Sequence, residues 1–436
     1  MQKSKTMKIN ISTKFKETEI GFIPEEWEVS DIGSFCSNMS SGGTPSRQNK
    51  EYYKSGSVYW VKTGELNDSY IYDTEEKITE DAIKNSSAKI FPKNTISLAM
   101  YGATVGKLGI FGTEASTNQA CCNMITNSDS DYKFLFYSLL NKREELVGRA
   151  NGAAQQNLSV GTVKSFKIAK PSLGEQKQIA EVLSSLDDKI ESNRKINANL
   201  EKLASSLFKQ WFVDFDFPNK DGEPYKTSGG KMVESELGEI PEGWRASVIG
   251  KELETYLGGT PSRDKTEYWT NGTVPWINSG MVNEYRVTRA SEYITEDAVK
   301  KSATKLLPKG TVVLAITGAT LGQYSLLEID SSFNQSVVGI KESEGLRKEY
   351  IYYWIATTIN ELINAQTGGA QQHINKQVVD SHKILVPEQI VLIKYYEIMK
   401  PIFDLIGKNC FENENLKMLR DSLLPKLMSG KIRVNR

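Results

Sequence analysis

Segments rich in glycine and in hydrogen-bonding side chains occur twice in this chain, in one order and at one spacing. Gly42-Gly-Thr-Pro-Ser-Arg47 returns as Gly258-Gly-Thr-Pro-Ser-Arg263, and Gly102-Ala-Thr104 returns as Gly318-Ala-Thr320. Glycine-rich loops let a backbone approach phosphates closely, while Arg, Lys, Asn and Gln side chains supply donors and acceptors that match base edges in a major groove. Such segments have the groups that a nucleic-acid contact needs, but residues identical in both copies can equally be identical because the fold requires them.

Sequence motifs of catalytic sites are either incomplete or missing in this chain. Gly102–Lys107 is one residue short of the spacing of a phosphate-binding loop, and Leu108 stands where Ser or Thr must hold magnesium. In the second copy Gln323 replaces Lys107. No Asn-Pro-Pro-Tyr or Asp-Pro-Pro-Tyr segment is present, so we do not expect the pocket in which a methyltransferase holds a flipped base. We expect no catalytic residue in this chain.

Metal-binding patterns are also missing from the sequence. The two histidines, His373 and His382, lie in the second copy and have no counterparts in the first, so we expect structural roles for them and no metal site. Four cysteines form no Cys-x-x-Cys pair, which is typical of structural thiols in a reducing compartment. They are Cys36, Cys121, Cys122 and Cys410.

The repeated segments keep a constant offset of 216 residues, as Gly258 follows Gly42, Trp276 follows Trp60 and Asn334-Gln335 follows Asn118-Gln119. This period far exceeds the roughly 20 to 50 residues of solenoid repeats, so it indicates two whole domains from one duplication. A chain of 436 residues is long enough for two domains with substantial cores. Such a protein presents two related surfaces.

Composition and charge limit the class of protein. Hydrophobic content of 39% and charged content of 25% are those of a soluble globular protein. No apolar run reaches the roughly 18 residues of a membrane span, and we expect a cytoplasmic protein without membrane contact. A formal net charge of zero argues against a non-specific nucleic-acid binder, which needs a positive excess, but not against a sequence-specific reader with local basic patches.

The local patterns predict a mixed α+β fold. Thr95–Met100 and Thr311–Ile316 follow a Pro-Lys turn and are rich in apolar residues, as buried strands are. Residues 80–88 and 132–147 are expected to be helical.

Each domain runs into a heptad pattern, with apolar residues at alternating spacings of three and four. Asn193 and Asn197 interrupt the first pattern, and Asn409 and Asn413 interrupt the second at equivalent positions. The shared phase favours two helices that pair with each other; the alternative is two amphipathic helices, each packed on its own domain. Pro401 has no counterpart and should kink or begin the second helix. The first pattern comprises Leu183, Leu186, Ile190, Asn193, Asn197, Leu200, Ala204, Leu207 and Trp211, and the second Met399, Ile402, Ile406, Asn409, Asn413, Leu416, Leu423 and Leu427.

The ordered set of motifs resembles the specificity (S) subunit of type I restriction-modification systems over nearly the whole chain from Ile20 onward. It comprises Ile-Pro-Glu-x-Trp, Gly-Gly-Thr-Pro-Ser, a strand Trp, Gly-Ala-Thr-x-Gly, Asn-Gln, Gln-Gln and a Glu-Gln that opens a long helix, present twice. The resemblance implies two α/β target recognition domains, each reading one half of a bipartite site in double-stranded DNA. It also implies a spacer of two long antiparallel helices.

The resemblance further implies partner subunits. Two modification (methyltransferase) subunits would bind S-adenosylmethionine, and restriction (endonuclease and translocase) subunits would use ATP and magnesium, with no cofactor bound by this chain. The expected domains are a first recognition domain at 17–172, a spacer helix at 173–215, a linker at 216–235, a second recognition domain at 236–387 and a second spacer helix at 388–430.

Comparison of the two copies sorts the candidate DNA-binding residues. If the domains read different half-sites, base-reading residues should differ, as Lys62 differs from Asn278 and Lys107 from Gln323, whereas matching residues contact the DNA backbone or support the fold. The candidates in the first copy are Thr44, Ser46, Arg47, Lys62, Thr63, Tyr101, Thr104, Lys107, Gln155 and Gln156. Those in the second copy are Thr260, Ser262, Arg263, Asn278, Ser279, Thr317, Thr320, Gln323, Gln371 and Gln372.

Two other functions remain open at the level of sequence. One is a scaffold protein without a DNA role, in which duplicated domains bind a protein partner; the neutral net charge is the observation in its favour. The other is a self-contained restriction-modification enzyme, which the missing catalytic motifs disfavour.

Overall fold

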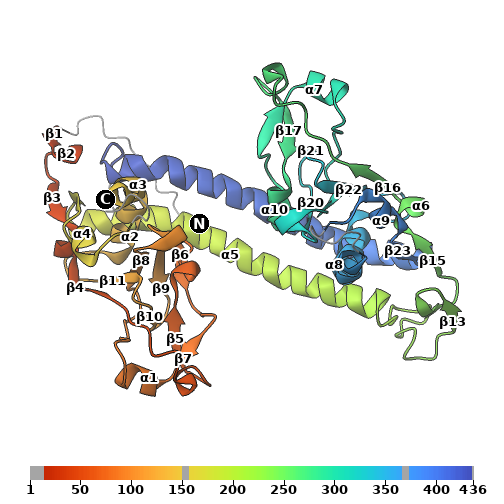
Figure 1. Ribbon diagram of the computed structural model, residues 1–436, viewed down its shortest axis with the longest axis horizontal. Coiled ribbons are helices and arrows are strands. Elements are labelled where there is room, and N and C mark those ends of the chain that lie inside the picture. The colour runs from red at the N-terminus through yellow and green to blue at the C-terminus, as the bar shows by residue number, and fades with distance from the viewer. Residues whose placement is uncertain (1–13, 150–156, 366–372, 435–436) are drawn as a thin grey trace, which may run out of the picture. The chain divides into compact units, whose positions relative to one another are not determined.

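A computed structural model describes residues 14–149, 157–365 and 373–434 of the chain (Figure 1). The chain divides into two compact units. Unit 1 comprises Met1–Lys189 and Leu416–Arg436, and unit 2 comprises Ile190–Asn415. Each unit has a mixed α/β domain and one part of the two long helices, α5 (Leu173–Phe212) and α10 (Gln389–Met428). The two expected copies are therefore both folded as α/β domains.

The core of unit 1 is a five-stranded sheet with strand order β4-β11-β8-β9-β6. These strands are β4 (Cys36–Ser41), β11 (Cys121–Thr126), β8 (Ile96–Ala99), β9 (Leu108–Phe111) and β6 (Ser69–Ile71). A three-stranded sheet, β10-β5-β7, consists of Ser116–Thr117, Val58–Val61 and Lys77–Ile78. Two pairs, β1 (Phe15–Thr18) with β2 (Gly21–Pro24) and β3 (Glu28–Asp31) with β12 (Lys167–Lys170), complete the strands described in this unit.

Unit 2 repeats this arrangement with four strands in its larger sheet, in the order β16-β22-β19-β20. They are β16 (Glu254–Leu257), β22 (Val337–Lys341), β19 (Val312–Ala315) and β20 (Tyr324–Leu326). The smaller sheet, β18-β17-β21, consists of Glu292–Ile294, Val274–Ile277 and Ser332–Phe333. Met232–Ser235 pairs with Gly238–Pro241 (β13, β14), and Arg245–Val248 pairs with Lys383–Val386 (β15, β23). An isolated parallel bridge between Val287 and Leu327 stands where β6 pairs with β9 in unit 1.

The larger sheet is buried on both faces in each unit because its side chains alternate between two hydrophobic clusters. In unit 1, Ile96 and Leu98 pack with the helices, while Ala99 packs with Val61 of the smaller sheet. In unit 2, Val312 and Leu314 pack with the helices, and Val313 and Ala315 with the smaller sheet. The expected buried strands at 95–100 and 311–316 are confirmed as β8 and β19.

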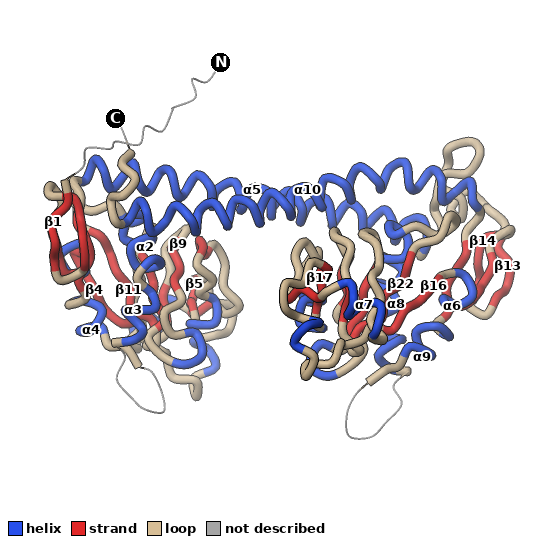
Figure 2. Tube along the Cα trace, turned by 90° about the horizontal axis from the view of Figure 1, so that it is seen from above, coloured by secondary structure: helices blue, strands red, loops and turns tan. Residues whose placement is uncertain are grey.

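Helices shorter than α5 and α10 pack on these sheets, and most of them are labelled in Figure 2. In unit 1 they are α1 (Glu80–Lys84), α2 (Tyr132–Asn141), α3 (Arg143–Gly148) and α4 (Val160–Lys164). In unit 2 they are α6 (Ile249–Glu252), α7 (Glu296–Lys301), α8 (Lys348–Asn364) and α9 (Lys376–Ser381).

The repeated Ile-Thr-Glu-Asp-Ala motif is a capped helix start. The Thr79 hydroxyl accepts a hydrogen bond from the Ala82 N–H, and Thr295 does the same for Ala298. The predicted helix at 132–147 is wrong in one respect, since it is interrupted at Lys142 between α2 and α3, and the helix at 80–88 already ends at Lys84.

The two long helices pair with each other, as the shared phase predicted. In unit 2 the Asn193 side chain donates to Asn413 at 3.0 Å, and Asn409 donates to Asn197 at 2.8 Å. In unit 1, Leu183 of α5 shares a cluster with Leu424 and Leu427 of α10. Asn193 pairs with Asn413, and Asn197, four residues later on α5, pairs with Asn409, four residues earlier on α10. The helices therefore run antiparallel in unit 2.

Pro401 does not begin the second helix. α10 begins at Gln389 and continues through this proline, which lies on the exposed side of the helix. A proline inside a helix removes one backbone hydrogen bond, and the packing of Met399, Ile402 and Phe403 in the core of unit 2 holds the helix on both sides of it.

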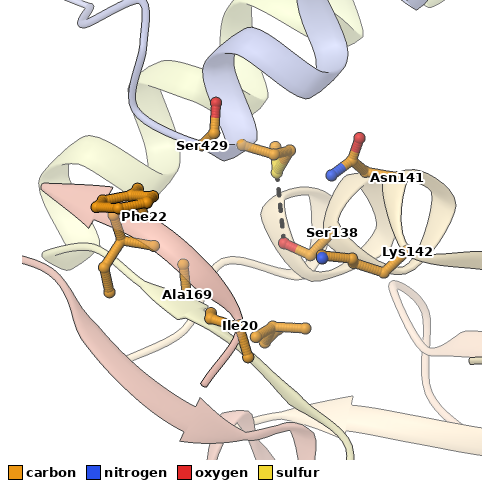
Figure 3. Close-up of a pocket in the computed structure, with 10 residues that line it drawn as sticks. Ile20, Phe22, Ser138, Asn141, Lys142, Ala169 and Ser429 are labelled. Carbon is orange, nitrogen blue, oxygen red and sulfur yellow. Dashed lines mark hydrogen bonds between the residues drawn. The ribbon is translucent and has the colours of Figure 1, made fainter. Parts of the chain in front are cut away.

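The C-terminal turn of α10 closes unit 1 against α2. The Ser138 hydroxyl donates a hydrogen bond to the Met428 sulfur at 3.5 Å (Figure 3). Gly430 packs against Pro24 and Trp27. A small cavity of about 110 Å³ remains there, lined by Phe22, Asn141, Lys142 and Ser429 among others. Among the described residues, no helix is long and apolar enough to cross a membrane.

Candidate functional site

The glycine motif is fixed by close packing against the smaller sheet. A Cβ on Gly42 would collide with the Thr117 hydroxyl, and one on Gly258 would collide with the Asn334 carbonyl oxygen. The Trp60 indole donates to the Gly43 carbonyl oxygen at 3.1 Å, and Trp276 donates to Gly259 at the same distance. These glycines and tryptophans are therefore repeated because the fold requires them, and they present the following Thr-Pro-Ser-Arg at the surface.

Hydrogen bonds join two of the expected loops in unit 1 through Gln119, which lies outside them. The Thr44 hydroxyl donates to the side-chain oxygen of Gln119, and the Tyr101 hydroxyl donates to the Gln119 carbonyl oxygen at 3.2 Å. Gln119 is exposed, so its amide group lies at the surface between the two candidates. In unit 2 the Thr260 hydroxyl donates to Gln335 at 2.6 Å, and Thr317 takes the place of the tyrosine.

Sequence reasoning left Gln119 and Gln335 out of the candidate set. Their repetition as Asn-Gln was visible, but two identical residues can equally belong to the scaffold. Their exposure and their contact with a candidate threonine identify them as surface amides, which are donors and acceptors suited to a DNA contact.

The Gly-Ala-Thr-x-Gly segments form open turns. Gly102 and Gly318 have φ values of 79° and 68°, in the left-handed region that favours glycine. An added Cβ at either position would meet nothing within 4 Å. These turns, Gly102–Thr104 and Gly318–Thr320, therefore project from the ends of β8 and β19.

Arg47 and Arg263 each make an ion pair inside their own unit. Arg47 donates two hydrogen bonds to Glu76 at 2.7 and 2.8 Å, and Arg263 donates two to Glu292 at 2.7 Å. The Arg47 guanidinium lies 4.2 Å from the Tyr53 ring centre, and that of Arg263 lies 3.5 Å from the centre of Trp269. Both side chains remain about half exposed. The repetition of these arginines is thus explained by the fold, and a phosphate contact stays a prediction.

Replacing Arg47 with Met should make the free energy of unfolding of unit 1 fall less steeply between pH 6 and pH 3.5. The hydrogen bonds from Arg47 lower the pKa of Glu76 to about 2. A carboxylate with a lowered pKa stabilises the folded state above its unfolded pKa of about 4.3, and this contribution is lost as the pH falls toward 2. We expect the variant to lose at most about 1 kcal/mol at pH 6, with a smaller difference from the native chain at pH 3.5.

Urea unfolding at these two pH values measures the effect. Lys54→Met is a matched control, because Lys54 is well exposed and lies 4.0 Å from Glu51. A difference between Arg47→Met and the native chain that stays constant from pH 6 to pH 3.5 would contradict the assigned role of Glu76.

The positions that differ between the copies carry different charges. Lys62 lies between Glu75 at 2.6 Å and Glu76 at 3.2 Å, whereas its counterpart Asn278 is exposed and uncharged. Lys107 is held by Asp68 at 3.2 Å, and Asp68 also pairs with Arg143. The loops of unit 1 therefore place cations beside carboxylates, which agrees with the neutral net charge.

The counterpart of Lys107 in unit 2 is Gln323, which is exposed. Glu284, the counterpart of Asp68, pairs with Arg289 at 3.1 Å. The two loop sets thus offer different donors and acceptors on equivalent scaffolds, as two readers of different sequences would.

The remaining candidates lie on the same loops or outside the described residues. Those in the structure are half or fully exposed: Ser46, Thr63, Thr104, Ser262, Ser279 and Thr320. Gln155, Gln156, Gln371 and Gln372 lie outside the described residues. The chain that follows them begins beside the open turns, since the Leu158 N–H donates to the Met100 carbonyl oxygen and Ile374 donates to Ile316.

No group of three metal-binding side chains occurs within 14–149, 157–365 and 373–434. His382 is partly buried, and burial lowers its pKa. Burial likewise raises the pKa of Cys121 and Cys122 to about 12, so these thiols are protonated at neutral pH.

Comparison with known proteins places both repeats in one family. The family described as type I restriction modification DNA specificity domain matches residues 24–202 and 241–408. The type I restriction enzyme MjaIX specificity subunit of Methanocaldococcus jannaschii is 32% identical over 437 residues, covering 98% of both chains. The HindI specificity subunit of Haemophilus influenzae is 23% identical over 356 residues, covering 69% of this chain and 77% of that one.

The fold agrees with a solved relative. The type I restriction-modification S subunit of Mycoplasma genitalium superposes with a TM-score of 0.60 at 17% identity, covering 97% of this chain and 98% of that one. With two matches along the chain and a relative of nearly equal length, this chain belongs to the family of type I restriction-modification DNA specificity subunits.

Proposed function

We propose that this chain is the subunit that selects the DNA sequence in a type I restriction-modification complex, with each unit reading one half of a bipartite site. The observation that carries the proposal is the match of the DNA specificity domain to both repeats. A scaffold without a DNA role would not account for that match, and the neutral charge that favoured it is explained by cations held beside carboxylates in the loops.

The proposed reading surface in each unit is the set of loops around the Thr-Gln hydrogen bond. It offers amide, hydroxyl and guanidinium groups, which can bond to base edges and phosphates. Matching residues such as Gln119 and Gln335 are suited to the same contact in both half-sites. Differing residues such as Lys62 and Asn278 are suited to distinguishing the two half-sites.

The proposed complex contains further subunits. Two methyltransferase subunits would supply the S-adenosylmethionine chemistry, and restriction subunits would supply ATP- and magnesium-dependent cleavage. The paired helices would hold the two reading units at a fixed separation and would offer docking surfaces to the methyltransferase subunits.

The purified chain is expected to bind duplex DNA with a split sequence preference but neither to methylate nor to cut it. Selection from a random duplex library at two salt concentrations tests the binding, because phosphate contacts make affinity fall with salt while base contacts preserve the preference. Incubation of the same chain with S-adenosylmethionine and DNA tests the chemistry. Enrichment of no motif, or methyl transfer without a partner subunit, would contradict the proposal.

A further inference from the structure

A carboxylate on α5 joins the α/β domain of unit 1 to the long helices. Asp187 accepts a hydrogen bond from the Tyr137 hydroxyl of α2 at 2.6 Å and another from Arg420 of α10 at 2.6 Å. Its side chain is 28% exposed, and that of Arg420 is 19% exposed. Three elements therefore meet at one partly buried acid.

A second carboxylate on α5 does the same in unit 2, at a more buried site. Glu201 accepts hydrogen bonds from Tyr285 at 2.6 Å and from Tyr353 of α8 at 2.8 Å. Its carboxylate also lies 3.8 Å from the guanidinium of Arg286, whose side chain is completely buried.

Arg286 connects this acid to the rest of unit 2. Its guanidinium lies 3.9 Å from Glu328, 4.4 Å from the ring centre of Tyr352 and 5.1 Å from that of Phe403 on α10. Glu328 in turn packs on α10 at Gly407, where a Cβ would come within 2.8 Å of its carboxylate. A buried charge is strongly destabilising when it loses its partner, so this network tolerates few alternative placements of the domain on the helix.

Asp187 and Glu201, the two acids that anchor the domains to α5, do not follow the symmetry of the duplication. Tyr137 and Tyr353 are equivalent residues, but Asp187 and Glu201 are not, and both lie on α5. At the equivalent positions α10 has Phe403 and Lys417. Glu201 follows Asp187 by fourteen residues, two heptads, which places both acids at the same heptad position.

We propose that Asp187 and Glu201 are positioning residues that fix each reading unit to α5, so that this one helix sets the number of unread base pairs between the two half-sites. The inference rests on the proposed function and adds to it that the two helices have different roles. α5 carries the attachment residues of both units, and α10 packs against α5. Equivalent tyrosines use the two acids as attachment points. Within the described part of the chain, neither acid contacts one of the candidate DNA-binding residues, although Tyr285 and Arg286, the partners of Glu201, lie between Glu284 and Arg289 of the unit 2 loops.

The test is the spacing of methylated sites in cells that carry this chain together with its partner subunits. Glu201→Gln and Asp187→Asn keep the size of each side chain and remove the charge. We expect the half-site sequences to stay unchanged, while the preference for the native spacing over spacings one base pair longer or shorter falls about tenfold in each variant. Tyr353→Phe removes one hydrogen bond to Glu201 with little change in volume and serves if Glu201→Gln fails to fold; we expect a smaller fall in the same direction.

Val313→Ala is the matched control, because it opens a cavity in the sheet of unit 2 without touching either acid. It should reduce the amount of active complex and leave the preference for the native spacing unchanged. If the acid variants also leave this preference unchanged, the positioning role is contradicted, even where they lower stability. If the native chain yields no split motif at all, the proposed function itself fails, so the two failures are distinguishable.

Discussion

Removing one heptad from each long helix should abolish methylation of the native sites or shorten the gap between the two half-sites. The deletion takes Lys189–Lys195 from α5 and Phe411–Lys417 from α10 together. It shortens each helix by about 10 Å, which corresponds to at most about three base pairs of duplex. Removing seven residues takes out almost two full turns of an α-helix, with a difference of only about 20°. The remaining apolar positions of each helix therefore still face the partner helix.

These two segments are chosen because the contacts on either side of them survive. Asp187 keeps Arg420, and Asn197 keeps Asn409. Half-site preferences should be unchanged, because the reading loops lie elsewhere in each unit. Removing Lys189–Lys195 alone is the control, since it leaves α10 one heptad too long and should prevent assembly. An active complex with the doubly shortened chain that still methylates sites of the native spacing would show that the helices do not set the distance.

Replacing Phe212 with Ala should destabilise unit 2 by about 3 to 5 kcal/mol. Phe212 is almost fully buried at the C-terminal end of α5. Its ring centre lies 4.9 Å from Tyr350 of α8 and 4.8 Å from Tyr395 of α10, so it joins the domain to both long helices. The truncation removes apolar contacts and leaves a cavity that rigid neighbouring rings cannot fill.

Hydrogen exchange resolves where that loss occurs. Peptides from the larger sheet of unit 2 should lose protection, while those from the sheet of unit 1 should keep it, because the cavity lies within unit 2. Phe22→Ala is the control, since this ring is 63% exposed and its loss should change the free energy of unfolding by less than about 0.5 kcal/mol. Equal loss of protection in both units would contradict this account of the core.

The regular elements were predictable wherever a pattern repeats with a physical cause. The heptad spacing located both long helices, and the inset asparagines correctly indicated that they pair, because a polar residue in an apolar contact needs a partner of its own kind. The continuation of α10 through Pro401 was not predictable, because tertiary packing on both sides outweighs the local cost of a proline.

The site was predictable only in outline. Repeated loops identified the surface, and the structure brings Thr44 and Tyr101 together at Gln119. The partner of Arg47 was hidden, since Glu76 lies 29 residues away and no local pattern connects the two. The anchors on α5 were hidden for a different reason: duplication suggests symmetric contacts, whereas Glu201 has no acidic counterpart on α10.

The most direct test of the central claim is the sequence motif methylated in cells that carry this chain and its partner subunits. If each unit reads one half-site, the motif consists of two short specific elements separated by a gap of fixed length and unread sequence. Exchanging Tyr101, Val105 and Lys107 for Thr, Leu and Gln, the residues at the equivalent positions of unit 2, should then alter one element only. A single uninterrupted motif, or the same methylation in cells that lack this chain, would contradict the account.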